Sequence, residues 1–297
     1  MISQSMKRFA IPAVLLAASA FSACQASDPA APSMVTPRLT LSRSKVPLGA
    51  PIEMTYRFVV ANDAKFTSNY HVMVHFGDQD EMLMYTDDHD PPTPTGSWKP
   101  GQTIEYTRTF FTPVYPYVGQ ATIEIGMYAP NEKLRVPMGG AGVTDTGHRS
   151  YKIATFQLLA QNEGVQMIYR DGWHPIEGAA ANNAGWHWTK KEATFAVKNP
   201  RKDCLFYLDV DNPSALFNMP QQVTVSLGSV ILDQFTVGPK QAVLRKIPVS
   251  SSAWGGGDSV ELRISVDKTF VPETLSPSTK DPRELGIRVL HAAIVPQ

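Results

Sequence analysis

The segment at residues 52–60 reads "IEMTYRFVV", and in it Ile52, Met54, Tyr56 and Phe58 alternate with more polar residues. Successive side chains of a β-strand point to opposite faces, so a period of two predicts a half-buried strand. The segments "NYHVMVHF", "TIEYTRTFF" and "QATIEIGMY" repeat the pattern. The chain is therefore built from half-buried strands.

Short turn signals separate these strands, among them "VPLGAP", "KPGQ", "APNEK" and "VGPK". No long segment keeps a helical stripe, so the fold class is all-β, with antiparallel β-sandwiches. The chain has 297 residues, enough for two ordinary domains. A first series of strands closes with "YKIATFQLLA" and a second begins with "VQMIYR". We place the two sandwiches at residues 37–162 and 163–297.

The amino terminus predicts export. Residues 1–23 have two basic residues followed by an apolar run shorter than the roughly 20 residues that span a bilayer, as in a signal peptide. The run ends in "FSAC", which looks like a bacterial lipobox with Cys24 as the lipidated residue, although Phe21 is unusual there. Ordinary cleavage after Ala20 is the alternative. Translation starts at Met1 or Met6.

Residues 24–36 are small, polar and proline-rich, and they are expected to form a flexible tether between the lipid and the folded body. A lipid anchor on Cys24 places the protein in the bacterial cell envelope, facing the periplasm or on the outer membrane. Gln25 lacks the acidic character of an inner-membrane retention signal and favours the outer membrane.

Composition restricts the partners and the chemistry. The 27 basic and 27 acidic residues give a net charge of zero, which argues against nucleic acid as a partner. No nucleophile elbow, P-loop or dinucleotide fingerprint is present, so we predict no enzyme and no cofactor. Asp171 with Glu177 could supply a glycosidase pair, but nothing singles them out. Cys204 stands in the apolar run "CLFYLDV" and is expected to be a buried, inert thiol.

The first half carries a resemblance in "VHFGDQD", "PPTPTGSWKPGQTI" and "GMYAPNEKLRVP". These motifs are similar to an immunoglobulin-like sandwich that accompanies bacterial membrane glycosyltransferases. The resemblance implies that the proline-rich loop leads to Trp98 and a turn at Pro100 and Gly101, and that it packs on one end of the sandwich.

The same loop raises a metal alternative. Asp87, Asp88 and Asp90 offer oxygen ligands suited to calcium, but their spacing is not that of an EF-hand loop. His71 and His75 would share a strand face about 13 Å apart at roughly 3.3 Å per residue, too far to ligate one zinc together. No metal site is assigned, and calcium binding at residues 87–90 stays open.

The second half resembles another β-sandwich module found with bacterial glycan-handling enzymes, and its strand pattern looks like a carbohydrate-binding-module jelly roll. The resemblance rests on "DGWHPIEGAAANNAGWHWTKKEATFAVKNP" and "KTFVPETLSPSTKDPRELGIRV". Aromatic side chains beside polar ones are what sugar rings need, because rings stack and hydroxyl groups take hydrogen bonds. The candidate glycan-binding residues are Trp173, His174, Glu177, Trp186, Trp188, Asp281 and Arg283.

A structural interpretation of these residues is also possible. Tryptophans at strand starts often close the end of a sandwich, Glu177 could pair with Arg283, and Asp281 could close a turn with Arg283. Two functions follow: a non-catalytic envelope lipoprotein that binds or organises surface polysaccharide, or an assembly protein that binds other envelope proteins and no sugar. Coplanar, exposed tryptophans would favour the first; burial of all three would favour the second.

Overall fold

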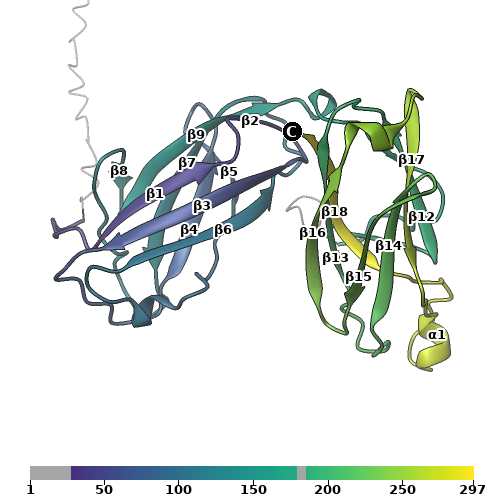
Figure 1. Ribbon diagram of the computed structural model, residues 1–297. Helices are drawn as coiled ribbons and strands as arrows, with labels where there is room; N and C mark the ends of the chain where they lie inside the picture. The colour runs from purple at the N-terminus through teal and green to yellow at the C-terminus, as the bar shows by residue number, and fades with distance from the viewer. Residues whose placement is uncertain (1–27, 179–184) are drawn as a thin grey trace, which may run out of the picture.

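The computed structural model describes residues 28–178 and 185–297. The predicted signal peptide at residues 1–23 and Cys24 lie outside the described residues, so lipidation stays a prediction. The described chain forms two β-sandwiches joined end to side (Figure 1). The predicted all-β class with two consecutive sandwiches is confirmed. No described helix is long and apolar enough to cross a membrane.

The first sandwich has a three-stranded sheet facing a six-stranded sheet. The smaller sheet runs in the order β1 (Val35–Leu41), β3 (Pro51–Val60), β6 (Thr103–Phe111). The larger one runs β2 (Lys45–Pro47), β9 (Ser150–Leu159), β7 (Gly119–Tyr128), β4 (His71–Gly77), β5 (Leu83–Thr86), with β8 (Thr144–Gly147) also on β9. Apart from the parallel pair β2 and β9, neighbours are antiparallel. This is an immunoglobulin-like order.

The predicted alternation of residues 52–60 is confirmed in β3. Ile52, Met54, Tyr56 and Phe58 are fully buried between the two sheets, whereas Arg57 is exposed. The pleat puts every second side chain into the core, and the hydrophobic effect fixes which face turns inward.

The second sandwich pairs a five-stranded with a four-stranded antiparallel sheet, as in a jelly roll. The five-stranded order is β10 (Met167–Tyr169), β12 (Glu192–Lys198), β17 (Ser259–Val266), β14 (Gln221–Leu227), β15 (Val230–Val237). The four-stranded order is β11 (His187–Trp188), β18 (Arg288–Pro296), β13 (Cys204–Asp211), β16 (Ala242–Val249). The short helical turns within the described ranges are η1 (Thr95–Ser97), η2 (Gln161–Glu163), η4 (Ser251–Trp254) and α1 (Pro272–Leu275).

The four-stranded sheet faces the end of the first sandwich (Figure 1). Phe111, at the end of β6, packs in a small apolar cluster with Tyr207, Ala293 and Val295. The ring of His291 stacks on Phe111, with centroids 4.3 Å apart and planes 8° from parallel. The second sandwich thus buries the last aromatic residue of β6.

Polar contacts reinforce this junction. Glu53 of β3 accepts a hydrogen bond from the Tyr207 hydroxyl at 3.1 Å and pairs with the Lys246 ammonium at 2.5 Å. Burial tends to raise the pKa of Glu53, but the Lys246 and Tyr207 hydrogen bonds and the charge of Lys246 outweigh it, so this pKa is lowered. Burial and the charge of Glu53 raise the pKa of Tyr207 to about 12. The junction therefore holds a carboxylate, an ammonium and a neutral phenol.

The proline-rich loop packs on the first sandwich as expected. Trp98 follows η1, is buried, and lies against Phe58 and Phe66 with ring centroids 5.5 Å away in each case. Its indole N–H donates to the Thr93 carbonyl at 2.9 Å. Gly101 has φ +74°, a conformation that side chains disfavour, which explains glycine in this turn. Trp98 closes this end of the core.

We expect Trp98→Ala to lower the free energy of unfolding of the first sandwich by about 3–5 kcal/mol, because truncating a buried tryptophan leaves a cavity. Urea denaturation followed by circular dichroism measures the loss. Val114→Ala is the control, since Val114 is 69% exposed, and it should change stability by less than about 0.5 kcal/mol. Equal midpoints for Trp98→Ala and the parent chain would contradict the packing role.

Cys204 is a buried free thiol, as the sequence predicts. Burial raises its pKa to about 11. In a Cys24→Ser chain at pH 8, reaction with Ellman's reagent should be about two orders of magnitude slower in the native state than in urea, because only the thiolate reacts. Equal rates in both states would show that the thiol is accessible and ionised.

Candidate functional site

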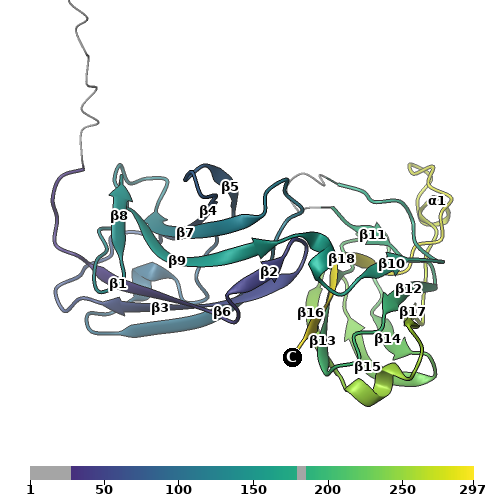
Figure 2. The same cartoon turned by 90° about the horizontal axis from the view of Figure 1, so that it is seen from above.

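A groove between the two sandwiches has a volume of about 660 Å³. One side is the loop after β2, at residues 47–50, with residues 161 and 162 beside it; the floor is β18, at residues 292–294; the other side includes residues 164–169 and Phe195. Viewed from above, β2 lies beside the end of β18 and the connection that leads to β10 (Figure 2). This volume is in the range of ligand sites, which often occur between domains.

The groove has one exposed aromatic ring, Tyr169 of β10, which is 44% exposed. Rings of three neighbours hold it: Trp173 at 4.9 Å, His187 at 4.5 Å and Phe195 at 4.9 Å between centroids. The aromatic cluster behind Tyr169 restrains its orientation, so its remaining surface forms a fixed apolar platform at the groove.

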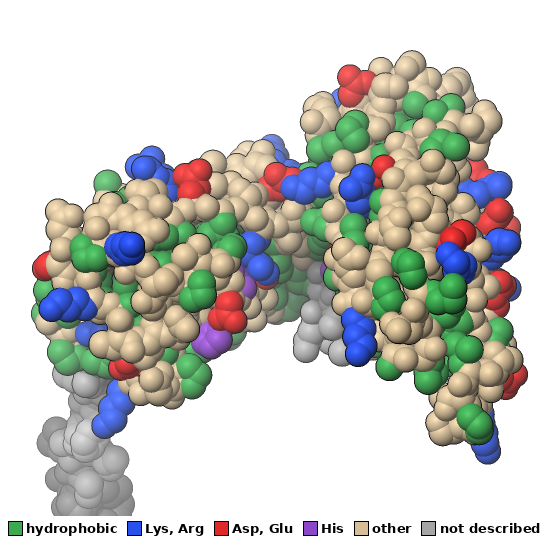
Figure 3. Space-filling view, turned by 60° about the horizontal axis from the view of Figure 1, so that its bottom comes forward, with side chains coloured by type: hydrophobic (Ala, Val, Ile, Leu, Met, Phe, Trp, Pro, Cys, Tyr) green, Lys and Arg blue, Asp and Glu red, His purple; other side chains and the backbone are tan. Residues whose placement is uncertain are grey.

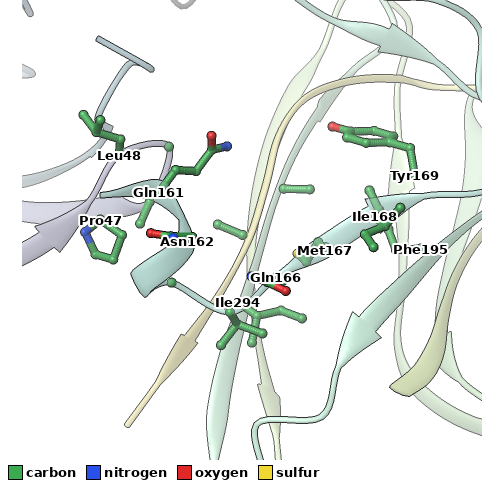
Figure 4. Close-up of a pocket in the computed structure, with 16 residues that line it drawn as sticks. Pro47, Leu48, Gln161, Asn162, Gln166, Met167, Ile168, Tyr169, Phe195 and Ile294 are labelled. Carbon is green, nitrogen blue, oxygen red and sulfur yellow. The ribbon is translucent and has the colours of Figure 1, made fainter. Parts of the chain in front are cut away.

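Three amide side chains provide the polar lining: Gln161, Asn162 and Gln166. All three are exposed, and no hydrogen bond joins these side chains to a described residue. Gln161 and Asn162 belong to η2, whose first turn is closed by the Glu163 carboxylate accepting the Ala160 backbone N–H at 3.2 Å. In Figure 4 the Gln161 amide and the Tyr169 hydroxyl reach into the groove from opposite sides.

The lining of this groove carries no charged side chain among the described residues. Amides donate and accept hydrogen bonds without a net charge. An aromatic platform opposite such amides is suited to a ligand with both an apolar face and hydroxyl groups.

The three predicted tryptophans do not form a common exposed platform among the described residues. Trp173 is half-buried, and its indole N–H donates to the Thr194 carbonyl at 2.8 Å. Trp188 is buried and packs edge-on against Phe270 in a satellite core. Trp186 is half-buried beneath the Arg288 guanidinium, 4.6 Å from its ring centroid. The structure gives each a packing role, and contact with a glycan stays a prediction.

The predicted polar residues gather around Arg283. Its guanidinium donates to Asp281 at 2.9 and 2.7 Å and to Glu177 at 2.5 Å. Glu177 is fixed in turn, because its backbone exchanges two 2.9 Å hydrogen bonds with Trp186. His174 takes part separately, with Nε2 2.7 Å from the Glu284 carbonyl. This is the pairing that the structural interpretation expects, and it fastens the segment before β11 to the segment before β18.

The pKa directions fit this network. The Asp281 side chain has a lowered pKa, first because Arg283 donates a hydrogen bond to it and further because the Arg283 backbone N–H does so. The hydrogen bond to the Asp281 carboxylate in turn raises the pKa of Arg283. Both groups are therefore charged at neutral pH and hold each other in place.

The carboxylates of the 87–90 loop have protein partners. Asp87 accepts hydrogen bonds from Arg108, Asp88 accepts the Val74 backbone N–H at 2.9 Å, and Asp90 lies 2.5 Å from His71. His71 and His75 both lie on β4, in line with their predicted strand placement. No three metal-binding side chains gather anywhere in the two described ranges.

Comparisons with known proteins return likenesses of fold only. No protein-family model and no curated protein matches the chain. Among solved structures, it is similar to a β-glucuronidase of Bacteroides uniformis, at 9% identity over 88% of this chain and 30% of that one, with a TM-score of 0.30. This chain thus spans less than a third of that enzyme.

Two further neighbours are carbohydrate-binding modules. One is a β-sandwich module described for its promiscuous specificity, at 12% identity over 89% of this chain and all of that one, with a TM-score of 0.26. The other is the tandem module of Paenibacillus barcinonensis Xyn10C, at 8% identity over 84% and 79%, with a TM-score of 0.28. At these scores the likenesses carry no argument about what this chain binds, and its site is argued from geometry.

The groove residues Gln161, Asn162, Gln166 and Tyr169 were missed by sequence reasoning. They occur together in "AQNEGVQMIYR", which the strand pattern marks only as a domain boundary. Three amides and one tyrosine within nine residues are a signal of a polar, aromatic surface. What the sequence does not show is the facing wall, which comes from residues 47–50 over a hundred positions earlier.

Asp281→Asn should lower the free energy of unfolding by about 1 kcal/mol at pH 7, the size of a partly exposed ion pair. The folded-state pKa is lowered, so the stabilisation is present above the unfolded pKa of about 4 and is lost as pH falls through the folded value. Urea denaturation at neutral and acid pH measures both effects.

The matched control for this change is Asp258→Asn, because the Asp258 side chain is 97% exposed and pairs only with Arg201 at 2.7 Å among the described residues. Its effect should be close to zero at every pH. A loss for Asp281→Asn that stayed constant down to about pH 2 would contradict the ion-pair explanation.

Proposed function

We propose that this protein is a non-catalytic glycan-binding protein of the bacterial envelope that holds a segment of polysaccharide in the groove between its two sandwiches. The observation that carries the proposal is one exposed, supported tyrosine ring in the same uncharged groove as three amide side chains that have no hydrogen-bond partner among the described residues.

Sugar rings present two kinds of surface. Their C–H faces are apolar and lie flat on aromatic rings, whereas their hydroxyl groups need donors and acceptors in the ring plane. Tyr169 supplies the platform, and Gln161, Asn162 and Gln166 supply groups that can donate and accept at once.

Binding without hydrolysis is part of the proposal. A glycosidase needs two carboxyl groups about 5 to 10 Å apart across its cleft, and the described lining of this groove includes none. Asp171 and Glu177 were the pair considered from sequence, and neither lines the groove. Glu177 is held by Arg283.

We assign the protein to the envelope through a lipid on Cys24, followed by a tether that is shorter than the predicted residues 24–36, because Val35 and Thr36 already belong to β1. This anchoring would leave the two sandwiches free to meet polysaccharide beside the membrane. We favour the outer membrane as the location, because Gln25 lacks the acidic character of an inner-membrane retention signal.

One observation favours the assembly alternative. Met82 and Leu83, where a loop enters β5, and Val114 and Val118, in the loop between β6 and β7, are exposed apolar residues of the first sandwich. A hydrogen bond from the Gln79 N–H to the Tyr117 hydroxyl joins these loops. Exposed apolar side chains that gather on a surface are typical of protein contacts. A partner held there would make the protein an assembly factor.

The test is isothermal titration calorimetry of the full chain with the host's envelope polysaccharide beside unrelated glycans. Tyr169→Ala should weaken binding about tenfold, equivalent to about 1.4 kcal/mol, because the platform is lost. Tyr128→Ala is the matched control, since Tyr128 ends β7 away from the groove and should leave affinity unchanged.

Trp186→Ala separates the groove from the tryptophan site predicted by sequence. Trp186 does not line the groove, so its removal should leave binding intact once circular dichroism shows the fold preserved. Loss of binding in Trp186→Ala with retention in Tyr169→Ala would move the site to the tryptophans. A flat titration with every glycan would contradict the proposed function and direct attention to protein partners by crosslinking in cells.

A further inference from the structure

A second hollow adjoins the groove beside the end of β18 and the loop after β12. It has a volume of about 470 Å³ and shares seven lining residues with the first, namely Pro47, Ala50, Asn162, Gly164, Val165, Gln166 and Ile294. The shared Pro47, Asn162, Gln166 and Ile294 lie on the side of the groove away from Tyr169 (Figure 4). The two hollows therefore adjoin along these residues, and together they are the channel of this protein.

The electrostatic character changes along this channel. The half around Tyr169 has no charged lining residue, whereas the second half is lined by Arg43, Lys198 and Lys202 against the single carboxylate of Glu163. The described lining thus carries an excess of two positive charges, three minus one, in a protein whose total formal charge is zero.

The lysines of the second half are available to a ligand. Lys198 and Lys202 are exposed, and neither forms an ion pair with a described residue. Two carboxylates of this region are engaged elsewhere. Asp203 accepts the Ser251 N–H at 2.6 Å, and Asp258, whose backbone carbonyl accepts the Asn199 N–H, pairs with Arg201. Arg43 is partly occupied, because its guanidinium donates to the Pro51 carbonyl.

Backbone contacts fix where these lysines stand. The Lys198 N–H donates to the Gln166 carbonyl at 3.0 Å, which ties the end of β12 to the groove wall. The Lys202 carbonyl accepts the indole N–H of the buried Trp254 at 2.9 Å. Both side chains therefore rise from anchored backbone rather than from a free loop. A rigid site loses less entropy when it binds.

We infer that the ligand is an acidic glycan, at least a disaccharide, whose sugar ring lies on Tyr169 while a carboxylate or phosphate of a neighbouring residue binds Lys198 and Lys202. This inference rests on the proposed function and names the substrate class of the same channel. Ammonium groups attract such anions as point charges, and the amides between the two halves bind the linking hydroxyls.

The test uses matched four-sugar oligomers of galacturonate, glucuronate and mannuronate, each as the free acid and as its neutral methyl ester, in calorimetric titrations of the full chain at about 20 mM salt. The acid of at least one pair should bind about fivefold to tenfold more tightly than its ester, the size expected for two exposed ion pairs. The preference should shrink at about 500 mM salt, where charges are screened.

Variants locate the effect. The double change Lys198→Gln and Lys202→Gln should abolish the preference for the acid and leave binding of the ester unchanged, while Tyr169→Ala weakens both forms. The control is Lys99→Gln with Lys133→Gln, two exposed lysines of the first sandwich outside the channel, which changes net charge equally.

The outcomes separate the inference from the proposed function. Equal binding of acid and ester would overturn the acidic-ligand inference and leave glycan binding standing. A preference that the Lys99 and Lys133 control also abolished would overturn it as well, because overall charge would then be the cause. Failure of every oligomer to bind in either form would overturn the acidic-ligand inference, and a flat titration of the host's envelope polysaccharide as well would overturn both.

Discussion

The burial of Phe111 against the second sandwich is the contact on which the rest of the arrangement depends. The ring ends β6, where a sandwich edge would meet water, and it is instead covered by His291, Tyr207 and the small side chains of β18. Burying one phenylalanine contributes about 1.5–3 kcal/mol. The Glu53 carboxylate pairs with Lys246 and Tyr207. This charged pair adds specificity to the junction, because it fixes which strands of the two sandwiches face each other.

The channel follows from that contact. It exists because the loop after β2 and the connection after β9 are held against β18, so neither sandwich contains the site alone. The division of the channel into an uncharged aromatic half and a basic half also depends on how the two sandwiches pack together. Acidic and basic side chains are interspersed over the face of the two lobes seen in Figure 3, whereas the channel concentrates one sign in one place. Local charge, rather than net charge, then selects the ligand.

The predictions from sequence were confirmed for features that depend on residues close together in the chain. The alternation in residues 52–60 became β3, and Cys204 became a buried thiol in β13. The proline-rich loop closes the sandwich through Trp98. The candidate site was weaker, because an exposed tryptophan and a packed one look alike in sequence. Trp188 fills a satellite core with Phe217 and Phe270, residues 29 and 82 positions further along.

The sequence by itself determined the strands, the faces they bury and the division into two sandwiches, because a period of two and its turn residues act between near neighbours. Only the tertiary structure decided where a ligand could lie. Tyr169, Gln161 and Lys198 line one channel because the loop at residues 47–50 packs against the second sandwich. That meeting is fixed by contacts between residues more than a hundred positions apart, and no local pattern encodes such pairings.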